Sequence, residues 1–186
     1  STLKKNAIVG TSSIRREIQL LKIRPDIRVK LIRGNVETRI RKVREGKFDA
    51  TLLAMAGLKR LNIKDNIMPL EICDFIPAVG QGAIAIIARQ NDEEIINLIR
   101  NISDFKTELE VSCEREFLSG IDGSCKTPIG GLALLKKSKE KSSIVFHYFS
   151  SNTEGKKIRT GIKVFAINLA MRECYFLGNR LNKILY

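Results

Sequence analysis

In the first third of the chain, segments whose apolar residues have the spacing of a strand alternate with segments whose apolar residues have the spacing of a helix. Ala7–Val9 is an apolar run typical of a buried strand. Apolar residues then recur at i, i+4 and i+7 from Ile14, the spacing of one helix face, and Pro25 is expected to end that helix. The elements predicted for this part are strands ending at Val9 and covering 28–32 and 48–54, with helices over about 14–23 and 36–45. Strands that alternate with helices predict an α/β fold with a parallel sheet.

The rest of the chain begins with an irregular stretch over 61–80 and ends in a different pattern. The apolar run Ala83–Ala88 predicts a buried strand, and the acids after Asn91 predict the start of a helix. A further helix is expected to begin at Asp104 and to end at Gly120. The last predicted elements are strands over 128–135, 144–151 and 158–164 and a helix over about 165–183. Short polar turns join these strands, so we expect a small α+β domain with a three-stranded antiparallel sheet.

Composition narrows the classes of function. The 186 residues carry a net charge of +13, which indicates an anionic partner such as nucleic acid, a membrane surface or an acidic small molecule. No apolar run approaches the length of a membrane span. Of these partners we expect the acidic small molecule, and neither nucleic acid nor a membrane. The four cysteines form no C-x-x-C pair and there is one histidine, so we expect no metal site.

A candidate anion site lies at Gly10–Arg16, between the first strand and the first helix. Gly10 allows a sharp turn, and a helix N-terminus offers unpaired N–H donors with a partial positive charge. The segment alone fits two interpretations equally well: an anion site, or a capped helix whose arginines are solvated. Side chains that follow the carboxyl ends of the predicted strands favour the anion site; they are Thr11, Ser13, Arg15, Arg16, Arg33, Arg39, Lys59 and Arg60.

A second candidate lies in the Gly-rich loop between the helix ending at Gly120 and the strand beginning at Pro128. This loop presents one cysteine, Cys125, among polar neighbours. A lone cysteine is most often a small buried apolar residue, but Lys126 can lower the pKa of this thiol. The residues therefore favour a reactive or derivatised cysteine.

Taken together, these motifs resemble the porphobilinogen deaminase family, also called hydroxymethylbilane synthase. The matching stretches occur in the family's order and cover nearly the whole chain, with a weaker match after about residue 136. They are GTSSIRR at 10–16, IRGNVETR at 32–39, ATLLAMAGLKRL at 50–61, PAVGQGAI at 77–84 and GSCKTPIG at 123–130.

The resemblance implies a transferase of tetrapyrrole (haem or chlorophyll) biosynthesis. Such enzymes join four porphobilinogen units head to tail into hydroxymethylbilane and release ammonia. They hold a dipyrromethane cofactor by a thioether, and Cys125 matches the cysteine that carries it. The other positions that match cofactor-binding residues are Thr11, Ser13, Arg15, Arg16, Arg33 and Arg39, and those that match substrate-binding residues are Arg15, Arg16, Arg39 and Arg60.

The resemblance also implies the organisation of the chain. Residues 1–81 correspond to domain two, 82–103 to a segment that returns to domain one, and 105–186 to domain three. Domain two is expected to have a periplasmic-binding-protein-like (type II) fold. The first part of domain one, with the family's catalytic aspartate, is missing, so no catalytic residue is expected here and the fragment alone should be inactive. Asp65, Asp74 and Asp122 are expected to be caps or surface acids.

Further expectations concern partners and dynamics. The substrate is expected to be porphobilinogen, the missing segment is an expected partner, and the complete protein is expected to be a monomer. Hinges are expected near Gly80 and at 103–106. The protein is expected in the cytoplasm, or in the plastid stroma if a transit peptide precedes Ser1. Two alternatives are a nucleic-acid-binding module, for which few aromatic residues are available, and a non-enzymatic protein that binds a small anion.

Overall fold

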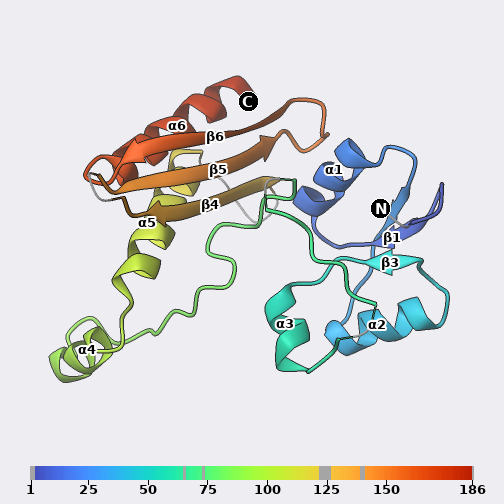
Figure 1. Ribbon diagram of the computed structural model, residues 1–186, viewed down its shortest axis with the longest axis horizontal. Helices are drawn as coiled ribbons and strands as arrows, with labels where there is room; N and C mark the ends of the chain where they lie inside the picture. The colour runs from blue at the N-terminus through green and yellow to red at the C-terminus, as the bar shows by residue number, and fades with distance from the viewer. Residues whose placement is uncertain (1–2, 65, 73, 122–126, 139–140, 186) are drawn as a thin grey trace. The chain divides into compact units, whose positions relative to one another are not determined.

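A three-stranded parallel sheet forms the first part of the fold (Figure 1). The computed structural model describes residues 3–64, 66–72, 74–121, 127–138 and 141–185. Strand β1 lies between β2 and β3, with Val9 opposite Val29 on one side and Ala50 on the other. The elements are β1 (Ile8–Gly10), α1 (Ile14–Ile23), β2 (Arg28–Lys30), α2 (Val36–Arg44), β3 (Ala50–Thr51) and α3 (Met55–Arg60). The predicted α/β alternation is confirmed.

Two strands are shorter than predicted in this part of the fold, and one helix was not predicted. Strand β2 ends at Lys30 and not at residue 32, and β3 covers two residues of the predicted 48–54. Ile32 nevertheless lies in the interior, because Gly10 has no side chain and leaves room for it. Helix α3 was not predicted, since Ala54, Ala56 and Gly57 are small residues of the kind found in turns.

A three-stranded antiparallel sheet with two helices forms the second part. The elements are α4 (Glu93–Arg100), α5 (Phe105–Gly120), β4 (Ile129–Lys136), β5 (Ser143–Ser151), β6 (Ile158–Ala166) and α6 (Ala170–Leu185), and the strand order is β4-β5-β6. Helices α5 and α6 pack on one face of the sheet around Phe117, Phe146 and Leu181. They approach closely at Gly120 and Gly178, where a Cβ atom on either glycine would collide with a backbone carbonyl oxygen of the other helix. Helix α6 begins at Ala170, five residues after the prediction, because β6 continues to Ala166.

The apolar segment at 83–88 is neither a strand nor buried, so this prediction is wrong for the chain as it stands. Ile84 and Ile87 are 86% and 92% exposed. An apolar run becomes a buried strand only when another strand pairs with it, and none does so among the described residues. Helix α4 forms as predicted, with Asp92 as its N-cap, but Ile95 and Leu98 on its apolar face are also exposed.

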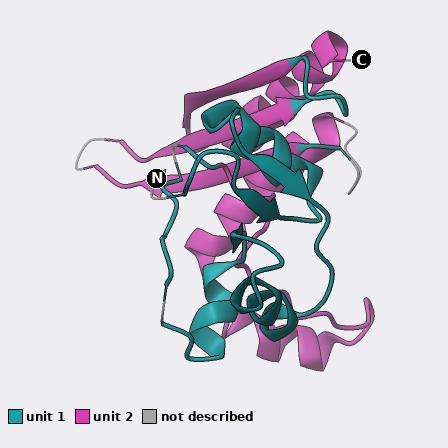
Figure 2. Cartoon of the chain, turned by 90° about the vertical axis from the view of Figure 1, so that its right-hand side faces the viewer, with its two compact units in different colours: residues 1–75, 125–128, 151–157 teal, residues 76–124, 129–150, 158–186 magenta. Residues whose placement is uncertain are grey.

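The chain divides into two compact units (Figure 2). The first comprises residues 1–75, 125–128 and 151–157, and the second comprises 76–124, 129–150 and 158–186. The domain boundaries expected from the resemblance stay predictions. No helix in the described part of the chain is long and apolar enough to cross a membrane.

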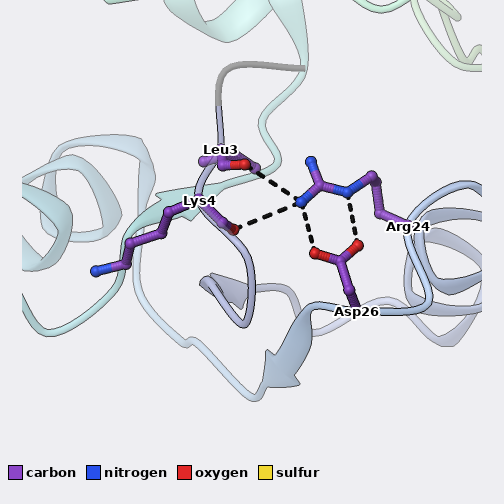
Figure 3. A network of polar contacts seen from close by, with 4 residues as sticks. All are labelled: Leu3, Lys4, Arg24 and Asp26. Atoms are coloured by element: carbon purple, nitrogen blue, oxygen red, sulfur yellow. Dashed lines mark hydrogen bonds and ion pairs between the residues drawn. The ribbon is translucent and has the colours of Figure 1, made fainter.

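A polar network joins the N-terminal segment to the turn after α1 (Figure 3). The Arg24 guanidinium donates from Nε and Nη2 to the two carboxylate oxygens of Asp26, each at 2.7 Å. Its Nη2 also donates to the backbone carbonyl oxygens of Leu3 and Lys4, at 3.2 and 3.5 Å. The hydrogen bonds from Arg24 are the largest cause that holds the pKa of Asp26 at about 2, below its usual value.

This network predicts an acid-sensitive contribution to stability. The folded state lowers the pKa of Asp26, so the contribution is present above the unfolded pKa of about 3.9 and is lost as pH falls toward about 2. In Asp26→Asn, the loss of thermal midpoint relative to the parent should be largest at pH 6 and should shrink steadily as pH falls to 2. Circular dichroism melts across this range measure it, with Asp74→Asn, an exposed carboxylate, as control. A difference that does not change with pH would contradict the assignment.

Candidate functional site

The turn from β1 into α1 is built from small residues that bond to the backbone. The N–H of Thr11 donates to the carbonyl oxygen of Lys30 at 3.1 Å, which holds the turn against β2. Thr11 is a buried residue, 4% exposed, and its hydroxyl accepts the N–H of Ser13 at 3.2 Å. Ser13 is the N-cap of α1, and its hydroxyl accepts the N–H of Arg16 at 3.4 Å. Because a hydroxyl that accepts one bond can still donate one, both side chains keep the capacity to bind an anion.

Two arginines in the first turn of α1 and one on α2 form an arginine cluster, which we define as Arg15, Arg16 and Arg39. Burial, followed by repulsion from Arg16, lowers the pKa of Arg15 to about 10. The pKa of Arg16 is lowered by burial and then by repulsion from Arg39. Positive charges that lower the pKa of a partly buried neighbouring arginine favour the binding of an anion.

Backbone carbonyls hold the cluster in place. Arg16 Nη1 donates to the carbonyl oxygen of Leu52, just after β3, at 2.9 Å. Arg39 Nε donates to the carbonyl oxygen of Gly34 at 2.8 Å, in the turn that precedes α2. Helix α2 itself is capped by Asn35, whose side chain accepts the N–H of Thr38 at 2.8 Å. Two of the three guanidinium groups are therefore oriented by fixed backbone, which lowers the entropy cost of binding a ligand.

The other predicted site residues are less closely tied to the cluster. Arg33 is exposed, and its carbonyl oxygen accepts Lys42 Nζ at 3.0 Å. Arg60 is exposed at the end of α3. Neither contributes to the lowered pKa of Arg15 or Arg16 in the part of the chain that the structure describes. Cys125 lies outside the described residues.

Two features of the site were missed by reading the sequence. The carbonyl oxygen of Leu52 is a backbone group 36 residues away from Arg16, and no side-chain pattern signals such a partner. Helix α3 places Lys59 and Arg60 at its C-terminal end, where cations interact favourably with the helix dipole. Over the described ranges, no group of three or more histidine, cysteine, aspartate or glutamate residues could hold a metal ion.

The fold and the site together define an α/β protein with an arginine cluster at the carboxyl edge of its parallel sheet, the arrangement of a protein that binds carboxylates or phosphates. Comparison with known families makes the class specific. The family model described as porphobilinogen deaminase, dipyromethane cofactor binding domain, matches residues 1–97, and the porphobilinogen deaminase C-terminal domain matches residues 108–186. The chain therefore belongs to the porphobilinogen deaminase family.

Curated relatives agree with this assignment. The porphobilinogen deaminase of Nitrobacter hamburgensis is 54% identical over 130 residues, which are 69% of this chain and 41% of the relative. That of Oceanobacillus iheyensis is 50% identical over 137 residues, 72% of this chain and 44% of the relative. That of Exiguobacterium sibiricum is 46% identical over 147 residues, 78% and 48% of the two chains. The chain thus spans between two fifths and half of the length of these relatives.

Proposed function

We propose that the chain is the part of a porphobilinogen deaminase that binds the cofactor and the growing product. The complete enzyme joins four porphobilinogen units head to tail into hydroxymethylbilane and releases ammonia. The observation that carries the proposal is the arginine cluster of Arg15, Arg16 and Arg39. Backbone carbonyl oxygens hold two of its guanidinium groups, and neighbouring positive charge lowers the pKa of Arg15 and of Arg16. Porphobilinogen carries an acetate and a propionate group, so each added unit brings two carboxylates that charge-assisted bonds can hold.

The residues present suit a dipyrromethane cofactor. Cys125 would hold it by a thioether, and its carboxylates would be bound by the arginine cluster, by Arg33 and by the hydroxyls of Thr11 and Ser13. The cofactor supplies the terminal pyrrole carbon to which the first substrate unit is joined. Arg15, Arg16, Arg39 and Arg60 would then bind and orient the carboxylates of substrate units. Hydroxyls that already bond the backbone are held in fixed positions, which favours this role.

The chain needs the first part of domain one to become an enzyme, and this missing segment is the partner that we propose. The family's catalytic aspartate belongs to that part, and we propose no catalytic residue here. Residues 82–103 would return to domain one, and the exposure of Ile84, Ile87 and Leu98 supports a role in which another chain segment covers them. Within the complete protein, which we expect to be a monomer, domain two would adopt the periplasmic-binding-protein-like (type II) fold.

The covalent cofactor gives the direct test. Freshly purified full-length protein should show an intact mass that exceeds the polypeptide mass by one dipyrromethane adduct, and the excess should vanish in Cys125→Ala. Mass spectrometry of the intact protein measures both. Cys113→Ala, which removes a buried thiol on α5, should keep the adduct. An unmodified Cys125 in the parent protein would sink the proposal and favour a non-enzymatic anion-binding protein.

The arginine cluster gives the second test. In the full-length protein, Arg16→Leu should lower the fraction that carries the adduct, or the turnover of porphobilinogen, by about ten- to a hundredfold, since a charge-assisted hydrogen bond is lost from the site. Arg44→Leu, an exposed arginine at the end of α2, is the matched control and should behave as the parent. Normal adduct and turnover in Arg16→Leu would contradict the role of the cluster.

The organisation of the chain gives the third test. Residues 1–186 alone should not consume porphobilinogen, because the catalytic aspartate is in the missing segment. Co-expression with the first part of domain one should restore turnover and should protect the backbone amides of 83–88 from hydrogen exchange. Turnover by residues 1–186 alone would show that the catalytic group lies within this chain.

A further inference from the structure

Among the described residues no strand pairs with the outer edge of β4, and two carboxylates accept hydrogen bonds from it. Since β4 is the first strand of the β4-β5-β6 sheet, alternate N–H groups along it point away from β5. The N–H of Ala133 donates to Glu114 Oε1 at 3.0 Å, and the N–H of Leu135 donates to Glu110 Oε1 at 2.6 Å. Glu110 and Glu114 stand one turn apart on α5, so their spacing matches that of alternate strand residues.

Glu114 also holds the segment that enters the second unit. Its other oxygen, Oε2, accepts the N–H of Gly80 at 2.6 Å. Three residues earlier, the carbonyl oxygen of Pro77 accepts the N–H of Gly131 on β4 at 3.1 Å. The segment Pro77–Gly80 is therefore fixed at both ends to the edge of β4, once directly and once through Glu114.

Because Glu114 is buried, its carboxylate depends on hydrogen bonds from the protein. Its residue is 4% exposed, and burial is the largest cause that raises the pKa of its carboxyl, while Gly80 and Ala133 lower it by donating hydrogen bonds. The neighbouring charge of Glu110 raises it further. A buried carboxylate needs its donors, so release of Gly80 would leave one of its oxygens without a partner.

We propose that Glu114 is a positioning residue that anchors Pro77–Gly80 to β4 and so places the joint between the two units upstream of Ile76. The turn near Gly80, which the sequence had indicated as a hinge, would then move with the second unit. The chain passes between the two units at five points, and the first of them, between Phe75 and Ile76, supports this placement. The irregular course of residues 66–72, most of which are exposed, supports it as well. Glu114 also ties α5 to β4, the two elements on either side of the Cys125 loop.

For turnover, this inference rests on the proposed function. If the cofactor is attached at Cys125, Glu114 joins the Pro77–Gly80 segment to α5 and β4, the helix and the strand between which the Cys125 loop lies in the sequence. Loss of the anchor would create a second joint at Gly80–Gly82. This second joint would disturb the movement of the units that elongation of the product requires. It would have less effect on the binding of the first porphobilinogen.

Hydrogen exchange on the full-length protein tests the anchor without any substrate. In Glu114→Gln the side-chain oxygen can accept one N–H while the amide nitrogen cannot accept the other, so the Gly80 or the Ala133 amide, or both, should exchange about tenfold faster or more. Glu114→Ala should release both amides. Glu114→Leu, which has no acceptor but keeps most of the side-chain volume, should do the same and takes its place if the alanine variant fails to fold. The matched control Glu110→Gln should release Leu135 and leave Gly80 unchanged. Parental exchange at Gly80 in both Glu114 variants would overturn the proposal.

Steady-state turnover of porphobilinogen tests the consequence. In Glu114→Gln the kcat should fall several-fold with KM close to the parental value, whereas Glu110→Gln should keep both constants. Equal kcat in Glu114→Gln and Glu110→Gln, despite faster exchange at Gly80, would overturn the positioning role. If the parental protein itself does not consume porphobilinogen, the proposed function fails, and the exchange at Gly80 still decides whether Glu114 is the anchor.

Discussion

The parallel-sheet unit must hold partly buried guanidinium groups close together although their positive charges repel one another. Arg15 and Arg16 are adjacent on α1, and Arg39 approaches Arg16 from α2. Burial removes the water that would screen these charges, so the cluster costs free energy in the unliganded protein. The carbonyl oxygen of Leu52 takes one donor of Arg16, and an anion can take others. A ligand with several carboxylates relieves this repulsion most, which links the stability of the unit to the choice of ligand.

Short-range contacts at the starts of two helices hold these charged side chains in place. Gly10 lets Ile32 pack beneath the turn, Ser13 caps α1 and Asn35 caps α2. Each cap fixes the first turn of a helix, and the arginines stand in or next to those turns. Short strands suffice, because the sheet only has to set the distance between the two helix N-termini. The positions of the arginine side chains therefore depend more on the helix caps than on the length of the strands.

Helix caps, which depend on residues close together in the chain, are also the features that the sequence predicts well. The helix starts expected after Asn91 and at Asp104 depend on residues three positions apart, and both are confirmed, as is the helix expected over about 14–23. The buried strand predicted at 83–88 failed because burial of an apolar run depends on a partner that is far away in the sequence or outside this chain. The approach of Arg39 to Arg16 follows from the packing of two helices, and the residue pattern gives no sign of it. Family resemblance could add residue roles, but not these contacts.

Glu114 illustrates why such contacts escape sequence reasoning and what they achieve. Its partners lie 34 and 19 residues away, and neither is a side chain, so no residue pairing could reveal them. A backbone carbonyl from a neighbouring strand would satisfy Ala133 alone, whereas a carboxylate has two oxygens and can join a sheet edge to a second segment. Moving that segment would leave a buried carboxylate without one of its donors, at a cost of about 1.5–3 kcal/mol. Glu114 therefore both occupies the outer edge of β4 and holds the Pro77–Gly80 segment in one conformation. A segment held in this way does not bend, so movement is confined to the residues before it.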